Sequence, residues 1–130
     1  MKTDIGLLWL RLTSGGIMLF SHGWGKLVNF TARMDSFPDP LGLGSPKVSL
    51  ALAVFAEVFC AFALMAGVLT RIVVLPLIIT MLVAVLIIHG DDPWSKKEFA
   101  LLFVVPYVTL FFTGAGNFSV DRFIFKKEHR

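Results

Sequence analysis

Long apolar segments, separated by short stretches rich in glycine, proline and charged residues, dominate this chain. They predict four helices, at about residues 4–28, 46–69, 71–89 and 96–113. Each segment holds roughly 18–25 residues, and about 20 residues of α-helix cross the hydrocarbon core of a bilayer. The pattern therefore predicts an all-α fold, an integral membrane four-helix bundle, formed as one transmembrane domain by residues 1–130.

Local signals mark the ends of these helices. Ser45 before Pro46 is typical of an N-cap followed by the first helical residue. The turn at residues 67–71 is so short that the second and third helices should be antiparallel neighbours. Residues 95–98, SKKE, have the form of a capping box. Residues 117–130 mix phenylalanine with lysine and arginine, which predicts an amphipathic basic tail at the membrane surface.

Composition supports a membrane location. Hydrophobic residues make up 56% of the chain and charged residues only 16%, with a mean hydropathy of +0.79. Soluble domains carry about 25% charged residues. Lysine and arginine lie slightly more often on the side of the termini, which favours cytoplasmic termini, and we expect a bacterial cytoplasmic membrane. Cys60 is the only cysteine, which excludes an intrachain disulfide and a CxxC redox pair.

The first predicted helix carries a polar stripe through membrane depth. Arg11, His22 and Lys26 fall on one face, because an α-helix turns about 100° per residue. A charge at that depth costs at least about 3 kcal/mol unless it faces protein or water. Glu57 lies at a similar depth in the second helix, so we predict a buried Arg11–Glu57 ion pair. Such a pair would be either a structural clasp or part of a proton- or ligand-handling site.

Four residues are predicted at the end of the helices opposite the termini, and they are the candidate ligand-binding residues: His22, Lys26, His89 and Glu98. Two imidazoles, an ammonium and a carboxylate would suit an anion, a quinone carbonyl or a proton relay. Structural alternatives exist for three of them. Lys26 would reach the headgroups, Glu98 would close the capping box, and His89 would be interfacial. His22 lies one turn deeper than Lys26 on the Arg11 face, which favours a functional role.

Other site chemistry finds little support. The two histidines raise haem or metal ligation, but their spacing does not require it, and we predict no metal site. A glycine-rich phosphate loop, a catalytic triad and an HExxH motif are absent from the sequence. We therefore assign no catalytic residue and exclude a hydrolase.

An ordered set of motifs resembles the DoxX family of small four-helix membrane proteins. The set comprises Arg11, residues 22–27 (HGWGKL), Glu57 with residues 67–71 (GVLTR), Glu98, and residues 114–121 (GAGNFSVD). The usual ending of the family reads GPG..SLD, so Ala115 and Val120 depart mildly from it. The resemblance covers nearly the whole chain.

This resemblance implies a membrane subunit associated with thiosulfate–quinone oxidoreduction or another redox or sulfur-handling system. The chain has no visible redox centre of its own, so we expect a subunit and not a self-sufficient enzyme. In the leading hypothesis His22 and Lys26 contact a quinone or a small anion. Glu98 or His89 would then exchange protons. A quinone is the candidate cofactor.

Two hypotheses from other functional classes stay open. The first is a small carrier of protons or solutes, motivated by the intramembrane Arg11 and Glu57. The second is a membrane scaffold without chemistry of its own, in which the polar face only holds the helices together. The expected partners are the lipid bilayer, an oxidoreductase subunit and further copies of this chain, and no nucleic acid is expected.

Overall fold

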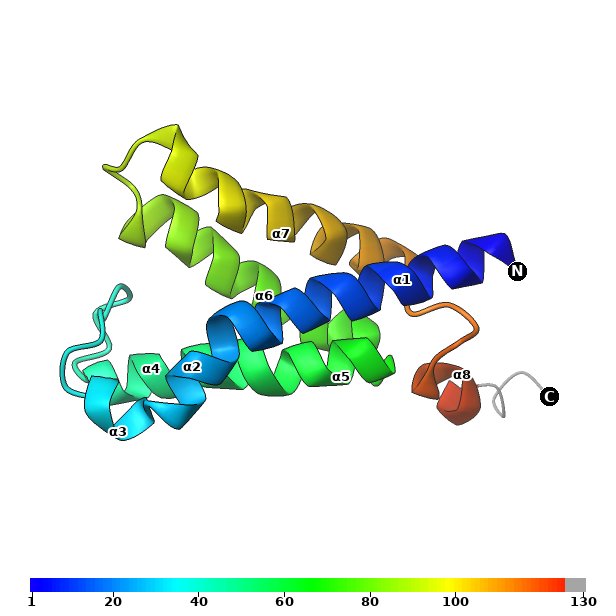
Figure 1. Ribbon diagram of the computed structural model, residues 1–130, viewed down its shortest axis with the longest axis horizontal. Coiled ribbons are helices and arrows are strands. Elements are labelled where there is room, and N and C mark those ends of the chain that lie inside the picture. The colour runs from blue at the N-terminus through cyan, green and yellow to red at the C-terminus, as the bar shows by residue number, and fades with distance from the viewer. Residues whose placement is uncertain (126–130) are drawn as a thin grey trace.

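The computed structural model describes residues 1–125, in which the regular structure is entirely helical. The last five residues of the predicted basic tail lie outside this range. Four long rods account for most of the described residues (Figure 1). The rods are α1 (Lys2–Ile17) with η1 (Met18–Gly23) and α2 (Trp24–Val28); α4 (Pro46–Val54) with η2 (Phe55–Cys60) and α5 (Ala61–Ala66); α6 (Thr70–Val83) with η3 (Ala84–Ile88); and α7 (Trp94–Thr113). Two short helices, α3 (Phe30–Arg33) and α8 (Val120–Phe125), complete the described part.

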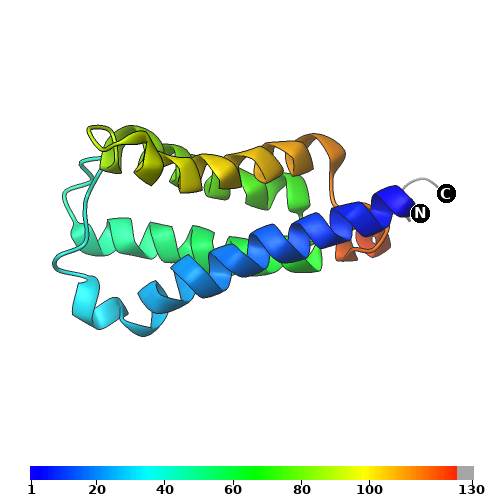
Figure 2. The same ribbon diagram turned by 45° about the horizontal axis from the view of Figure 1, so that its top comes forward.

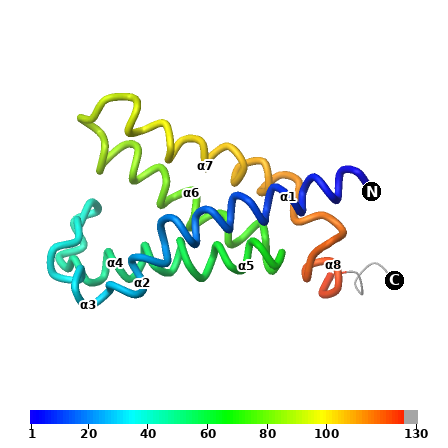
Figure 3. The backbone as a smooth tube through the Cα atoms, viewed as in Figure 1, coloured from blue at the N-terminus to red at the C-terminus, as the bar shows by residue number. Residues whose placement is uncertain are grey.

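The rods are arranged as two packed pairs. The rod that begins with α1 crosses α5, and α6 forms an antiparallel hairpin with α7 (Figures 1 and 2). The start of α1 and the helix α8 lie at one end of the molecule, and residues 29–45 and 89–93 lie at the other (Figure 3). Toward the latter end the α6–α7 hairpin diverges from α2 and α4 (Figures 1 and 3).

Helix ends follow the sequence signals in part. The Ser45 hydroxyl accepts a hydrogen bond from the Val48 amide at 3.4 Å, with Pro46 as the first residue of α4. Gly67, with a φ of +77°, ends α5, and α6 starts three residues later. Helix α7 begins at Trp94 without a side-chain capping bond. The capping box predicted at residues 95–98 is therefore wrong, because the helix starts one residue before Ser95.

Three turns of the rods are π-helical, namely η1, η2 and η3. A π-turn holds one more residue than an α-turn and is frequent at functional sites. Turns η1 and η2 contact each other, and η3 ends directly before His89. These irregular turns therefore occur where the predicted site residues lie.

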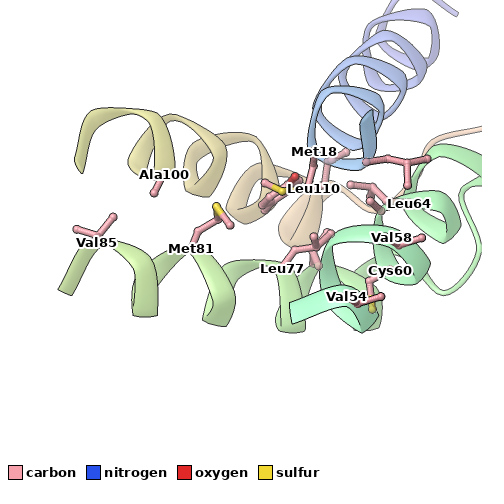
Figure 4. Close-up of a cluster of buried hydrophobic side chains, with 14 of the residues drawn as sticks. Met18, Val54, Val58, Cys60, Leu64, Leu77, Met81, Val85, Ala100 and Leu110 are labelled. Carbon is pink, nitrogen blue, oxygen red and sulfur yellow. The ribbon is translucent and has the colours of Figure 1, made fainter. Parts of the chain in front are cut away.

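The core runs along the shared interior of the rods (Figure 4). Met18, Leu77 and Leu110 are fully buried and come from three different rods. The second rod adds Leu50 and Leu64, which are also fully buried. Burying an aliphatic side chain of this size contributes about 1.5–3 kcal/mol in water.

The outer surface is apolar. Large exposed side chains include Phe62, Leu86, Phe99 and Phe112, each more than 60% exposed. Two helices are long and apolar enough to cross a membrane: Pro46–Ala66, with 21 residues and a mean hydropathy of 2.3, and Thr70–Ile88, with 19 residues and a mean hydropathy of 2.9. Contiguous exposed apolar surface of this kind suits contact with lipid.

Candidate functional site

A buried ion pair joins the first rod to the second. The ammonium Nζ of Lys26 lies 2.8 and 2.7 Å from Oε1 and Oε2 of Glu57. The Glu57 side chain is 3% exposed and that of Lys26 is 22% exposed. Removing one partner of an ion pair that is this well shielded would leave an uncompensated buried charge.

Close backbone contact places the two charges. A β-carbon added to Gly23 would lie 2.5 Å from the backbone oxygen of Glu57, so only glycine allows the two rods to meet here. Gly23 is the last residue of η1, and Glu57 lies inside η2. From this contact point, Lys26 reaches the carboxylate from one turn further along its rod.

Arg11 does not pair with Glu57, which corrects the predicted ion pair. Arg11 is fully buried, and its guanidinium donates to the backbone oxygen of Met65 at 3.3 Å and to that of Phe118. It thereby ties α1 to the end of α5 and to the turn before α8. The Nε atom of Arg11 has no hydrogen-bond partner among the described residues.

The direction of the side chains explains why Glu57 pairs with Lys26 and not with Arg11. In an α-helix each Cα–Cβ bond leans toward the N-terminus of its own helix. The first two rods are antiparallel, so Arg11 leans toward the end that holds the termini and Glu57 leans away from it. Lys26 lies beyond Glu57 and leans back toward it. The depth of the residues along the rods favoured Arg11 as the partner of Glu57, but the direction of the side chains brings Lys26 to it.

Four polar candidates meet around one cavity. The cavity has a volume of about 290 Å³, and its polar lining comprises His22, Lys26, Glu57, His89 and Lys96. Two imidazoles, two ammonium groups and one carboxylate therefore face a common space, with Phe37 and Phe103 among its apolar walls. Lys96 was not predicted as a site residue; its place directly after the short loop to α7 was the only signal in the sequence.

The histidines differ in their surroundings. His22 packs edge-on against the ring of Phe103, with ring centroids 5.7 Å apart. Nδ1 of His89 lies 2.7 Å from Oδ2 of Asp92 across the turn between η3 and α7. This hydrogen bond holds the pKa of Asp92 below its ordinary value. A hydrogen bond thus positions His89, whereas an aromatic contact holds His22 in the wall of the cavity.

Glu98 stands apart from the other candidates. It is exposed on α7 and does not line the cavity. Its neighbour one turn deeper, Leu102, faces outward as well. Of the two carboxylates singled out in the sequence, that of Glu57 lines the cavity and that of Glu98 does not.

Comparison with known proteins identifies the family of this chain. The DoxX family model matches residues 6–90, which include Arg11, His22, Lys26, Glu57 and His89. The chain belongs to the DoxX family. An uncharacterized protein of Haemophilus influenzae is 34% identical over 124 residues, which cover 92% of this chain and 79% of that relative. No solved structure matches the chain.

Two further hollows of the DoxX protein adjoin the polar cavity. One, of about 350 Å³, lies between α4, η2, α6 and residues 37–43, and it shares Lys26 and Glu57 with the polar cavity. The other is an apolar groove of about 540 Å³ between the first rod and α7, which shares His22, Phe99 and Phe103. The ion pair therefore belongs to the lining of two cavities, and His22 lines both the polar cavity and the groove.

Within residues 1–125 of the DoxX protein, His, Cys, Asp and Glu side chains form no group of three that would hold a metal ion. Cys60 is buried in η2 and faces the core. At the polar cavity, Lys26, Glu57 and the two histidines offer hydrogen bonding, charge and proton exchange.

Proposed function

We propose that this DoxX protein is a four-helix integral membrane subunit whose polar cavity binds a quinone or a small anion. The observation that carries the proposal is the convergence of His22, Lys26, Glu57 and His89 on one cavity of about 290 Å³. Ligand sites are concave, largely apolar and fitted with few convergent polar groups, and this cavity has those properties. The proposed setting is a redox or sulfur-handling membrane system of the thiosulfate–quinone type, which the resemblance to DoxX proteins supports.

The residues present fit a quinone head. An ammonium has three N–H donors, and the contacts with Glu57 account for two of those of Lys26. The third would donate to a quinone carbonyl, with the His22 imidazole as a second partner. The groove between the first rod and α7 leads from the lipid-facing surface to His22 and has room for an apolar tail. When bound, a quinone would supply two-electron redox chemistry, and this chain would orient its head and exchange protons.

In this proposal the four rods form the membrane-spanning body that surrounds the polar cavity. All four rods cross the bilayer, with α1 and α7 shielding their polar residues against α5 and α6. Both termini lie in the cytoplasm. An oxidoreductase subunit would deliver or collect the electrons, and further copies of the chain would complete the assembly.

A small carrier of protons or acids is the second candidate. The favouring observation is the position of Lys26 and Glu57 between two cavities. A carrier needs a charged group that both sides can reach, and intramembrane charges often mark such routes. Proteoliposomes that contain the protein and show no flux of protons, thiosulfate or small carboxylates would exclude this function.

Mass spectrometry of molecules retained on gentle purification tests the proposal. The parent protein should retain a quinone or a small anion, and His22→Ala and Lys26→Met should lose it while remaining folded. Lys47→Met is the control, because Lys47 is exposed on α4 and does not line the polar cavity. Equal retention by the parent, His22→Ala and Lys26→Met would overturn the assignment of the site.

A further inference from the structure

The charges around the polar cavity restrict how it accepts an anion. Among the described residues that line the cavity, Glu57 carries the only carboxylate, and both of its oxygens accept hydrogen bonds from Lys26. No other hydrogen-bond donor reaches these oxygens within the described residues. The hydroxyl of Tyr107 is the neighbouring candidate on α7, but it donates to the backbone oxygen of Ser14 at 3.1 Å. Lys26 is therefore the sole counter-ion of Glu57.

We infer that a small oxyanion binds at Lys26 together with one proton, which is taken up by Glu57. The inference deepens the proposed function and rests on its anion-binding form. An anion on Lys26 would face the Glu57 carboxylate at close range in a site shielded from water. Two like charges in such a site are not stable together, and one of them takes up a proton. The step is H⁺ from solution plus the Glu57 carboxylate giving a carboxylic acid, whose O–H keeps its proton and donates a hydrogen bond to the anion.

The other titratable groups around the site are less suited to hold this proton. His22 is exposed on η1, and His89 is one-third exposed and already bonded to Asp92. Lys96, exposed on α7, is cationic and has no proton to gain. α6 adds only Met81 to the lining, and η3 adds Ala84 and Ile88. The Glu57 carboxylate already contacts Lys26, so an anion bound at Lys26 lies closer to it than to either imidazole and perturbs it more.

Nitrate and thiosulfate are the probes, because both stay fully deprotonated near neutral pH and any proton taken up belongs to the protein. Binding is measured by titration calorimetry in two buffers of different ionisation enthalpy. The parent should take up about one proton per anion, and its Kd should rise about tenfold per pH unit across neutral pH. Glu57→Gln should take up almost none and show a flat pH dependence. Lys47→Met should behave as the parent.

Proton uptake that persists in Glu57→Gln, or anion binding by the parent without uptake, would overturn the inference. If Glu57→Gln fails to fold, the double variant His22→Gln/His89→Gln decides: uptake kept in full supports Glu57, and uptake lost assigns the proton to the histidines. If the parent binds neither anion but retains a quinone, the inference fails and the proposed function stands. If it binds neither anion and retains no quinone, both fail.

Discussion

The backbone of Gly23 lies directly against the backbone oxygen of Glu57, and this contact fixes the distance between the first two rods at the site. A β-carbon at Gly23 would lie 2.5 Å from that oxygen and 2.9 Å from a methyl group of Val58. Both atoms belong to residues of η2, and the Glu57 oxygen is part of its backbone, so neither can move far to admit a β-carbon. The Lys26–Glu57 pair depends on this close approach.

Gly23→Ala should therefore destabilise the protein by about 1–2 kcal/mol, since overpacking costs about 1–3 kcal/mol and alanine returns part of this through its helix propensity. Gly25→Ala is the matched control, because nothing lies within 4 Å of its added β-carbon. Thermal unfolding in detergent should show a lower Tm for Gly23→Ala and an equal or higher Tm for Gly25→Ala. Equal Tm values for both variants would contradict the close contact.

Lys26→Met should cost about 3–5 kcal/mol at neutral pH, because it leaves the buried Glu57 carboxylate without a counter-ion. Protonation of Glu57 relieves that charge, so the loss should shrink as the pH falls. Urea or thermal unfolding at pH 5 and pH 8 measures the difference. The double variant Lys26→Met/Glu57→Gln should be less destabilised at pH 8 than Lys26→Met alone. A loss that does not depend on pH would exclude an unpaired carboxylate.

Arg11→Lys should destabilise the protein by about 2–3 kcal/mol, because lysine does not reproduce the two-pronged donation to Met65 and Phe118. Arg71→Lys provides the control: Arg71 is exposed and makes one bond, to the backbone oxygen of Phe112 at 3.3 Å. The turn before α8 should become sensitive to protease in Arg11→Lys only. Binding of an anion at Lys26 should survive in the folded fraction, because Arg11 lies outside the polar cavity.

Asp121→Asn should loosen the start of α6. The carboxylate of Asp121 accepts from the backbone amides of Leu69 at 2.6 Å and Thr70 at 3.0 Å, and so caps a helix more than fifty residues earlier in the chain. Leu69 has a φ of +48°, an unfavourable backbone conformation that this cap holds in place. We expect a loss of about 1 kcal/mol and faster hydrogen exchange at these two amides. The exposed Asp91, changed to asparagine, should leave both amides unaffected.

Acid should loosen the loop of residues 37–45, which borders the cavity of about 350 Å³. The Asp39 carboxylate accepts from the Ser49 hydroxyl at 2.7 Å and from the amides of Leu43 and Gly44. These hydrogen bonds, led by that from Ser49, lower the pKa of Asp39 below its ordinary value of 3.8. The stabilisation is thus complete above 3.8 and is lost as the pH falls through the lowered pKa. Hydrogen exchange of residues 37–45 should be faster in Asp39→Asn than in the parent at pH 7, and the two should converge in acid.

The sequence predicts much of the helix pattern because apolar periodicity and local caps suffice for it. Ser45 and Pro46 start α4 as their residue types indicate, and Gly67 ends α5 with the positive φ that glycine favours. The start of α7 was misjudged, because Pro93 sets the entry to the helix and Ser95 already lies within it. Pro93 and Ser95 are both residues that often precede a helix, and α7 starts directly after the first of them.

The site was harder to predict. His22, Lys26 and His89 share one cavity, as expected, but Glu98 lies outside it and Glu57 replaces it. The predicted partner of Glu57 was wrong because depth along a helix was counted, whereas the direction of the side chains and the π-turns was not. Hydrophobic periodicity does not reveal a π-turn easily, since the extra residue shifts the apolar pattern by only one position. The contact of Gly23 with Glu57 depends on two such turns.

The π-turn η1 has a consequence for how this chain tolerates change in length. It places six residues, Met18–Gly23, before α2 resumes. Deleting one residue within that stretch would let the rod continue as an uninterrupted α-helix with the later residues on their present face, because a π-turn takes up its extra residue within one turn. A deletion within the regular part of α1 would instead turn everything after it by about 100° around the axis. The first deletion should leave the ammonium of Lys26 facing Glu57, and the second should turn it away.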